Sequence, residues 1–273
     1  MKKLAVLGPK GTYCDIAARK VISNLGLDVS IEYYDSIMKA ANAVSDMSYA
    51  LVPFENTLDG FVLEALDSIV SKNSHIVSQI KLPVDFAFVS FSKDISKVKN
   101  IYCQFKALGQ CLEFINKYDF TIEKTNSNTQ TYKKILSTND DTYGAIIPMH
   151  LLTKDNVFSL VIPHIADLKN NETRFVLLQK EEVIDTSNSF DASIMVTFSN
   201  DKPGLLYEMS KIFHDLNINM KTIMSRPLKT TMGRYKFYIE ASFNKGEMEL
   251  LDKLLVKLND NFKADLLGVY NSL

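Results

Sequence analysis

The chain has 273 residues, 46% of them hydrophobic and 23% charged, and its formal net charge is -1. This length predicts roughly two domains, and the balanced charge gives no general reason to bind nucleic acid or an anionic membrane. Apolar runs fall short of the ~18 residues of a membrane span, the first residues do not fit a signal peptide, and the three cysteines lack disulfide or zinc spacing. We therefore expect a cytoplasmic protein whose function is small-molecule chemistry or contact with other proteins.

Strands and helices alternate over the first third of the chain. A short apolar strand is followed by a glycine turn, with Gly8 and Gly11, and then by a stretch of helical periodicity. The same order repeats twice more, which predicts a mostly parallel sheet. The predicted strands lie at 4–8, 30–34 and 49–54, and the predicted helices at 12–25, 37–47 and 61–71.

The alternation restarts in the middle third, after long apolar strands between residues 76 and 91. The predicted strands there lie at 99–105, 120–124 and 143–148, and the predicted helices at 107–118 and 128–136. A further apolar strand, at 170–180, follows a loop. We expect it to run back into the first lobe and leave a cleft between two lobes, which is a common place for a ligand.

The last part of the chain begins after a polar segment without periodicity, between about Glu181 and Asp191, which we interpret as a domain boundary. Beyond it the pattern reads strand, helix, strand, strand, helix, strand, at 192–199, 203–216, 218–228, 234–243, 247–258 and 262–270. This order is the ferredoxin-like split βαβ arrangement.

Two predicted helix starts are candidate anion sites. Gly11 and Thr12 precede the first helix, and Asn128 and Thr129 precede a helix of the second lobe. Free backbone N–H groups at a helix start attract anions, although a turn and a helix cap would equally explain these residues. If the two helix starts face one cleft, they could hold two carboxylates.

Three polar residues, Glu55, Asn56 and Thr57, stand where the third predicted strand ends. The carboxyl ends of strands are where open α/β sheets bind ligands. We expect Glu55 to orient a neighbouring side chain, Asn56 to offer its amide, and Thr57 to cap the following helix. A solvated loop carboxylate remains the alternative for Glu55.

Thr173, Arg174 and Phe175 open the strand at 170–180. Strand alternation would send Thr173 and Phe175 to one face and Arg174 to the other, unless the chain bends. The guanidinium fork of an arginine suits a carboxylate, whereas a threonine at a strand start is often structural. The four histidines show no triad or metal-like spacing, and we assign them no chemistry.

Four motifs occur in order along the chain: GPKGT at 8–12, VPFENTLDG at 52–60, NETRF at 171–175, and a βαββαβ tail with MSRP at 224–227. Together they resemble prephenate dehydratase with a C-terminal ACT regulatory domain. The resemblance implies an α/β fold with a two-lobed, periplasmic-binding-protein-like catalytic domain at 1–182 and a ferredoxin-like ACT domain at 191–273. The first lobe would comprise roughly 1–76 with 165–182, and the second 77–164.

The resemblance also implies a reaction: prephenate loses carbon dioxide and its ring hydroxyl to give phenylpyruvate, in phenylalanine synthesis, without a metal or organic cofactor. The implied catalytic residues are Thr173, as donor to the leaving oxygen, and Arg174, Glu55 and Asn56. Arg174 would either pair with a substrate carboxylate or hold the loop. The implied substrate contacts come from Gly11, Thr12, Thr57, Asn128, Thr129 and Phe175.

Members of this family bind phenylalanine between paired ACT domains. The resemblance therefore implies a homodimer or homotetramer with allosteric phenylalanine at Gly204, Leu205, Leu206, Ser225, Arg226 and Pro227.

The sequence also departs from the family pattern. Gln104, Phe105 and Lys106 stand where a histidine-proline-glutamine run is usual, Cys14 replaces a serine, and Met224 replaces a glutamate. Two other functions stay open. One is a prephenate decarboxylase that does not aromatise its substrate, against which the ACT tail argues. The other is a non-catalytic protein that senses a small carboxylate or phenylalanine, which the departure at 104–106 keeps in play.

Overall fold

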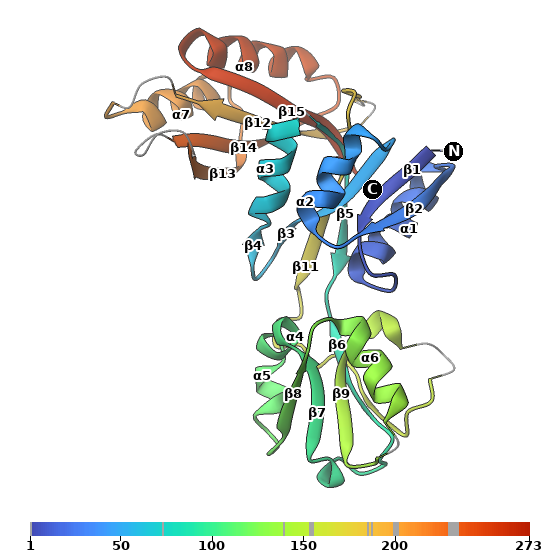
Figure 1. Cartoon of the computed structure of the whole chain (residues 1–273). Coiled ribbons are helices and arrows are strands. Elements are labelled where there is room, and N and C mark those ends of the chain that lie inside the picture. Colours follow the sequence, from blue (N-terminus) through green and yellow to red (C-terminus); the bar gives the residue numbers. More distant parts are fainter. Residues whose placement is uncertain are drawn as a thin grey trace.

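The structure is a computed structural model that describes residues 2–72, 74–138, 140–152, 156–184, 186, 188–198, 202–228 and 235–273. Two α/β lobes follow one another along the chain, and a βαββαβ unit sits against the first (Figure 1). The α/β class is confirmed. Two residues at the ends of predicted strands, Ser199 and Arg234, lie outside the described residues. None of the described helices is long and apolar enough to cross a membrane.

The first lobe is built on a sheet in the order β2-β1-β3-β11-β5. β1 pairs in parallel with β2 and β3, whereas β11 runs antiparallel between β3 and β5, as the predicted return of the strand at 170–180 requires. Its elements are β1 (Lys2–Leu7), α1 (Tyr13–Leu25), β2 (Val29–Tyr34), α2 (Ile37–Asn42), η1 (Ala43–Ser45), β3 (Tyr49–Asn56), β4 (Gly60–Phe61), α3 (Leu63–Lys72), β5 (His75–Pro83) and β11 (Glu172–Gln179).

Side-chain alternation along the strands sets the layers of this lobe. Leu4 and Val6 of β1 pack with α1 on one face, while Ala5 packs with α2 and α3 on the other. β1 is thus apolar on both faces, as in a sheet covered by helices on both sides.

The second lobe has a five-stranded sheet in the order β10-β6-β9-β7-β8. Its elements are β6 (Phe86–Ser90), η2 (Ile95–Lys97), β7 (Asn100–Gln104), α4 (Phe105–Gly109), α5 (Leu112–Ile115), β8 (Thr121–Thr125), α6 (Asn128–Ser137), β9 (Tyr143–Pro148), η3 (Met149–Leu151) and β10 (Leu160–Ile162). Two crossing segments, after β5 and before β11, join the lobes (Figure 1). The first lobe extends a few residues beyond the boundary expected near residue 77, because β5 stays paired with β11 as far as Pro83.

The helix expected at 107–118 is also corrected, since α4 and α5 are separate short helices. The backbone N–H groups of Leu112 and Glu113 donate to the Asp167 carboxylate, at 2.8 and 3.0 Å, so a long-range acceptor starts the second helix anew. Similarly, the helix expected at 37–47 ends as α2 at Asn42 and continues as the 3₁₀ turn η1.

The C-terminal unit comprises β12 (Phe190–Thr197), α7 (Leu205–Asp215), β13 (Met220–Pro227), β14 (Tyr235–Phe243), α8 (Met248–Asn261) and β15 (Lys263–Ser272), with strands in the order β13-β14-β12-β15. Both helices cover one face of this sheet, where Ile194 and Val196 pack with them. Residues that point to the opposite face of the sheet, such as Met195, pack instead with the core of the first lobe.

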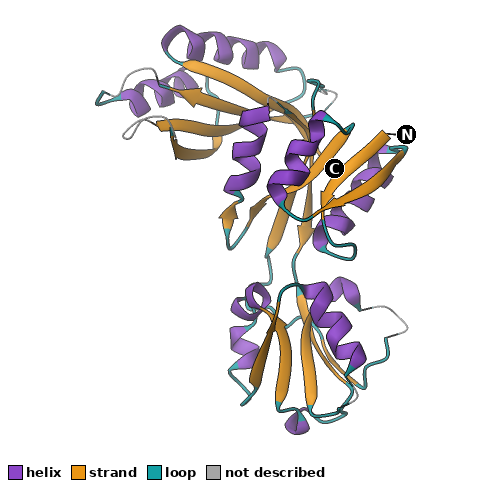
Figure 2. Cartoon of the chain, viewed as in Figure 1, coloured by secondary structure: helices purple, strands orange, loops and turns teal. Residues whose placement is uncertain are grey.

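β15 joins the two sheets into one, because its end pairs in parallel with β5 at Ser78 and Gln79 (Figure 2). The approach is close at Gly268, where a Cβ atom would lie 2.1 Å from the carbonyl oxygen of Ile76. A side chain at residue 268 would therefore force the two strands apart.

The three cysteines, Cys14, Cys103 and Cys111, are buried and unpaired. Burial raises the pKa of the Cys14 and Cys103 thiols to about 12 and raises that of Cys111 as well.

Candidate active site

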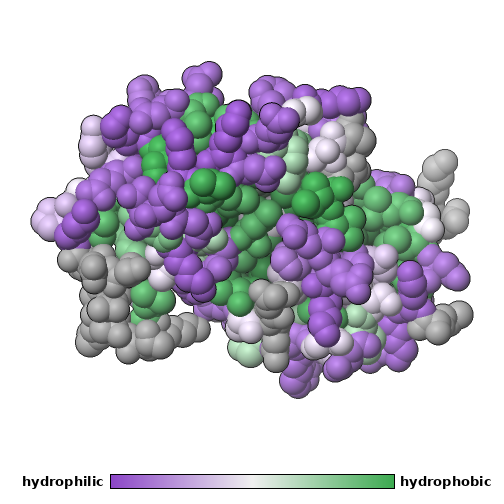
Figure 3. Space-filling model, turned by 90° about the horizontal axis from the view of Figure 1, so that it is seen from above, coloured by the Kyte–Doolittle hydropathy of each residue, from purple (hydrophilic) through white to green (hydrophobic). Residues whose placement is uncertain are grey.

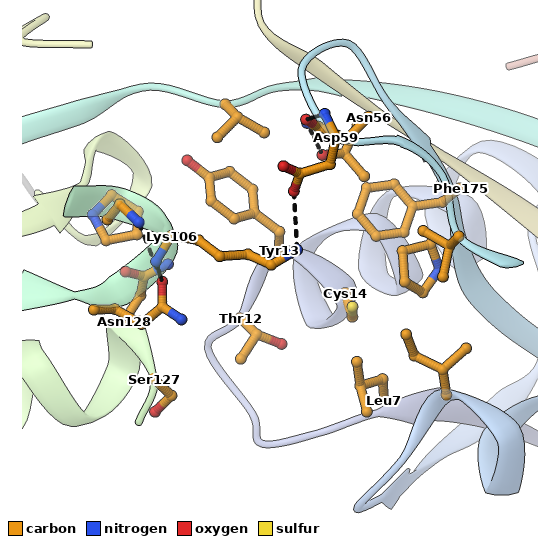
Figure 4. Close-up of a pocket in the computed structure, with 18 of the residues that line it drawn as sticks. Leu7, Thr12, Tyr13, Cys14, Asn56, Asp59, Lys106, Ser127, Asn128 and Phe175 are labelled. Carbon is orange, nitrogen blue, oxygen red and sulfur yellow. Dashed lines mark hydrogen bonds and ion pairs between the residues drawn. The ribbon is translucent and has the colours of Figure 1, made fainter. Parts of the chain in front are cut away.

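A cavity of about 650 Å³ lies between the two lobes (Figure 4). Six predicted site residues line it: Gly11, Thr12, Asn56, Asn128, Thr173 and Phe175. Four others, Glu55, Thr57, Thr129 and Arg174, are not among its lining residues. Polar groups reach it from both lobes, and aromatic rings supply much of its apolar wall.

Asn56 and Thr173 form a hydrogen-bonded pair on the cavity wall. They face each other across β3 and β11, and the Asn56 Nδ2 donates to Thr173 Oγ1 at 3.0 Å. The Asn56 Oδ1 accepts from the backbone N–H groups of Leu58 and Asp59, which fixes which way the amide points. Because Thr173 Oγ1 is the acceptor, and donates to no described residue, its own proton is available to a ligand.

A polar chain continues from this pair toward the second lobe. Asn171, which is buried, accepts from Asn56 Nδ2 at 2.9 Å and donates to Gln110 Oε1 at 3.1 Å. Gln110 lines the cavity from the second lobe. The amide of Asn56 is thereby tied to both sides of the cleft.

The two predicted helix starts do meet across the cleft, but Gly11 is not a free anion site. Its N–H donates to the Asp15 carboxylate at 2.9 Å, and Thr12 caps α1. A Cβ atom on Gly11 would lie 3.9 Å from Thr129 Oγ1, so the start of α6 stands opposite. Asn128 Oδ1 and Thr129 Oγ1 are buried without a hydrogen-bond partner among the described residues.

Arg174 points away from the cavity, as strand alternation predicts. Its guanidinium donates to both carboxylate oxygens of Glu240 at 2.7 and 3.0 Å, lies 2.9 Å from Glu55 Oε2, and donates to Gln79. Burial alone would lower the pKa of Arg174, but the Glu240 carboxylate outweighs it and holds this pKa above its usual value. Of the two roles expected for Arg174, these contacts do not fit the pairing with a substrate carboxylate, because protein carboxylates bind this guanidinium; they are compatible with the role of holding the chain in place.

The role expected for Thr57 is also corrected, because this residue does not cap a helix. Its backbone N–H and its hydroxyl bond the Glu172 carbonyl oxygen at 3.0 and 3.2 Å, and its hydroxyl accepts from the Glu172 N–H. The β3–β4 turn intervenes before α3, which begins at Leu63. Thr57 therefore fastens the end of β3 to the start of β11.

An ion pair spans the mouth of the site. Lys106 Nζ, on α4 of the second lobe, lies 2.9 Å from Asp59 Oδ2, in the turn after β3 of the first lobe (Figure 4). Lys106 is the one lysine or arginine among the described residues that line the cavity.

The model of the prephenate dehydratase family matches residues 4–183. This chain belongs to the prephenate dehydratase family. It is 31% identical to the prephenate dehydratase of Methanocaldococcus jannaschii over 264 residues, which cover 96% of this chain and 95% of that one. It is 29% identical to the prephenate dehydratase of Lactococcus lactis subsp. cremoris, covering 89% of this chain and 87% of that one.

Solved prephenate dehydratases share the fold. The enzyme from Staphylococcus aureus Mu50 superposes with a TM-score of 0.83 at 27% identity, covering 99% of this chain and all of that one. The enzyme from Arthrobacter aurescens, solved in complex with L-Phe, superposes with a TM-score of 0.79 at 22% identity over 98% of this chain and 89% of that one.

The motif residues expected to bind phenylalanine in this prephenate dehydratase family member occupy two places in the C-terminal unit. Gly204, with φ +92°, precedes α7, and is followed by buried Leu205 and exposed Leu206. Ser225, Arg226 and Pro227 end β13, the edge strand of the sheet. The Arg226 Nη2 lies 2.9 Å from Asp67 of α3, so this guanidinium binds the first lobe.

His150 lines the cavity, although the sequence assigned it no chemistry. Its ring lies edge-on to Tyr13, with centroids 4.5 Å apart, and its Nε2 lies 3.2 Å from the Gly11 carbonyl oxygen. Burial lowers the pKa of His150, so the ring is neutral near pH 7. Its position just after the end of β9 is the same strand-end signal that singled out Asn56.

No group of three or more His, Cys, Asp or Glu side chains in the described part of the chain could hold a metal ion.

Proposed function

We propose that the protein is a prephenate dehydratase, which converts prephenate to phenylpyruvate, carbon dioxide and water in phenylalanine synthesis. The observation that carries the proposal is the Thr173 hydroxyl, held by Asn56 at the wall of the cavity between the lobes. Membership of the family and similarity to curated prephenate dehydratases along nearly the whole chain support it.

The reaction needs help mainly where the ring hydroxyl departs. As the ring carboxylate leaves as carbon dioxide, its electron pair enters the ring, which becomes aromatic and expels hydroxide. The Thr173 O–H would donate a hydrogen bond to that oxygen, while the Asn56 N–H stabilises negative charge on Thr173 Oγ1. Such preorganised donors act most where charge develops in the transition state. Because a threonine is a weak acid, we favour partial proton donation over full ionisation.

The apolar part of the wall suits the substrate ring. Phe61, Phe86, Phe175 and Tyr13 line the cavity, and its size is typical of small-molecule sites. These rings would align the breaking bonds and exclude bulk water from the reacting carbons.

We assign Arg174 and Glu55 a positioning role. Their ion pair, on the opposite face from Thr173, fixes neighbouring residues of β11 and β3, the two strands that carry Thr173 and Asn56. In this proposal they act on the reaction through those strands, without touching the substrate.

The test is to incubate the full chain with prephenate and follow phenylpyruvate by its absorbance. We expect turnover by the native protein and by Thr173→Ser, and a large loss in Thr173→Ala. Release of carbon dioxide without an aromatic product would instead indicate a prephenate decarboxylase. Binding of prephenate without any product would indicate a sensing protein.

We further propose that residues 1–182 form the catalytic domain and 191–273 an ACT domain, which binds phenylalanine where two copies associate. The L-Phe complex of the Arthrobacter relative supports regulation by this amino acid. Exposed apolar side chains on the C-terminal unit, including Tyr207, Val256 and Ile223, support association. Seen from above, the molecule shows hydrophobic areas among hydrophilic ones (Figure 3). Three unpaired thiols favour a cytoplasmic location.

Calorimetry with L-phenylalanine tests the regulatory proposal. Gly204 and Gly246 both have positive φ, of +92° and +87°, and open space around them, so Val at either place introduces comparable backbone strain. We expect Gly204→Val to lose phenylalanine binding and Gly246→Val to keep it. Equal loss in both variants, or no binding to the native chain, would contradict the proposed site.

A further inference from the structure

The charge around the cavity is poorly matched to a dianion such as prephenate. Among the described lining residues, Asp59 and Glu64 are acidic, His150 is neutral near pH 7, and Lys106 is the one lysine or arginine. Arg174 is turned away and already bound. If the proposed function is right, on which this inference rests, Lys106 is the side chain that can meet a substrate carboxylate with a full charge.

Lys106 is bound to Asp59 in a way that permits exchange. The two side chains are 58% and 49% exposed, and so exposed an ion pair contributes little to stability. A substrate carboxylate could therefore displace Asp59 at small cost.

Asp59 belongs to the same turn as the catalytic amide. Its backbone N–H donates to Asn56 Oδ1 at 3.1 Å, whereas its side chain reaches the second lobe through Lys106 (Figure 4). The ion pair thus links the turn next to Asn56 and Thr173 with α4 across the cleft. A ligand that binds Lys106 also releases this link.

We propose that Lys106 is the substrate-binding cation of this site and that Asp59 occupies it while the site is empty. The carboxylate that Lys106 binds is the one on the side chain, which survives in phenylpyruvate. A cation on the ring carboxylate would stabilise the charge that decarboxylation removes, and so would slow the reaction. Lys106 therefore determines specificity for substrates with a charged side chain, and Asp59 competes with them.

Three variants of the full chain test this assignment: Lys106→Gln, Asp59→Asn and Lys117→Gln. Lys117 is an exposed lysine of the second lobe that does not line the cavity, so its variant controls for the change in net charge. We expect Lys106→Gln to raise KM for prephenate about tenfold or more, and to raise it more than it lowers kcat, as loss of a charged hydrogen bond predicts. Asp59→Asn should lower KM, because the competitor is neutral, and Lys117→Gln should leave it unchanged.

Calorimetry with phenylpyruvate separates this inference from the proposed function. The product keeps the side-chain carboxylate, so its Kd should rise in Lys106→Gln by about the same factor as KM. Unchanged phenylpyruvate affinity in Lys106→Gln, or equal loss in Lys117→Gln, would overturn the role of Lys106. If the native chain formed no phenylpyruvate but bound it in a Lys106-dependent way, the proposed function would fail while the binding role of Lys106 stood.

Discussion

The first lobe has two neighbours, and it meets them in different ways. Toward the second lobe it leaves a cavity, crossed by the Asn171–Gln110 and His150–Gly11 hydrogen bonds and by the Lys106–Asp59 ion pair. Toward the C-terminal unit it continues its sheet into β15 and shares one apolar core, in which Val176 and Leu178 pack with Tyr238 and Tyr270.

The ion pairs of the two contacts also differ in burial. Arg174 and Glu240 form an ion pair between the first lobe and the C-terminal unit, and these residues are 5% and 2% exposed. The hydroxyls of Tyr238 and Tyr270 donate to the same Glu240 oxygen, at 2.6 and 3.0 Å. A buried pair with this many hydrogen bonds fixes one geometry, whereas an exposed pair can be exchanged.

The difference teaches where this molecule can move. Opening between the lobes would break separate side-chain contacts, while separating the C-terminal unit would split a sheet and expose a buried charge. We infer that the first lobe and the C-terminal unit move together. Any regulatory signal from that unit would then reach Thr173 along β11, through Arg174 in the next position.

The largest expected effect comes from breaking the buried contact with Glu240→Gln. Arg174 keeps Glu55 but loses its buried partner, and we expect a loss of about 3 kcal/mol in the free energy of unfolding. Urea unfolding measures it. The double variant Arg174→Met with Glu240→Leu should lose less, because no charge is left buried. A loss below about 1 kcal/mol in Glu240→Gln would show that the contact is not tightly held.

Thr173→Ala sharpens the comparison, because Thr173 and Arg174 lie on opposite faces of one strand. We expect kcat for prephenate to fall on the order of 10²-fold or more, since a donor to developing charge is lost. The free energy of unfolding, measured in urea, should change by less than about 1 kcal/mol, because one partly buried hydrogen bond is lost. Near-native turnover in a folded Thr173→Ala variant would make this residue purely structural.

Arg174→Lys tests whether charge alone holds the contact between the first lobe and the C-terminal unit. A lysine cannot reproduce the two parallel bonds to Glu240, so we expect a loss of roughly 1–2 kcal/mol in unfolding free energy. We also expect Arg174→Lys to restore little of the activity lost in Arg174→Ala. Native stability and activity in the lysine variant would show that geometry at this position is unimportant.

Acid should weaken the contact between the first lobe and the C-terminal unit, because Asp191 lies in it and accepts a hydrogen bond from Gln79. Burial would raise the pKa of Asp191, but hydrogen bonds from Lys221, Ser242 and Gln79 hold this pKa below its usual value. A lowered folded-state pKa adds stability that is present above the unfolded value and is lost as the pH falls through the folded value. The free energy of unfolding should therefore decline below about pH 5. Asp191→Asn should flatten that decline, and an unchanged slope would count against this assignment.

The smallest effect should come from a change in the contact between the two lobes. Lys106→Gln removes an exposed ion pair, and we expect the free energy of unfolding to change by less than about 0.5 kcal/mol. Urea unfolding beside Glu240→Gln makes the comparison direct. A loss as large as that of Glu240→Gln would mean that the two contacts are equally tight.

Much of this arrangement follows from local sequence patterns. Apolar alternation and glycine turns predicted the order of strands and helices, and strand alternation correctly separated Thr173 from Arg174. The strand-end rule found Asn56. These succeed because each depends on a few neighbouring residues.

The partner of Arg174 could not be predicted in this way. Glu240 lies 66 residues further along, on β14 of another unit, and nothing local pairs the two. The same holds for Asp167, which interrupts the helix expected at 107–118 from a distance. His150 could have been found, because it follows a predicted strand end, whereas the reach of Lys106 to Asp59 depends on how the lobes close.

Burial of all three thiols makes this protein convenient for distance spectroscopy. A thiol with its pKa near 12 is almost wholly protonated at neutral pH and reacts slowly with maleimides or methanethiosulfonates. Cysteines introduced at two exposed positions, Asn24 on α1 and Lys133 on α6, could then carry spin labels without removal of Cys14, Cys103 or Cys111. Such a pair would record the breathing of the cleft as a distribution of interspin distances, in the empty protein and with each ligand.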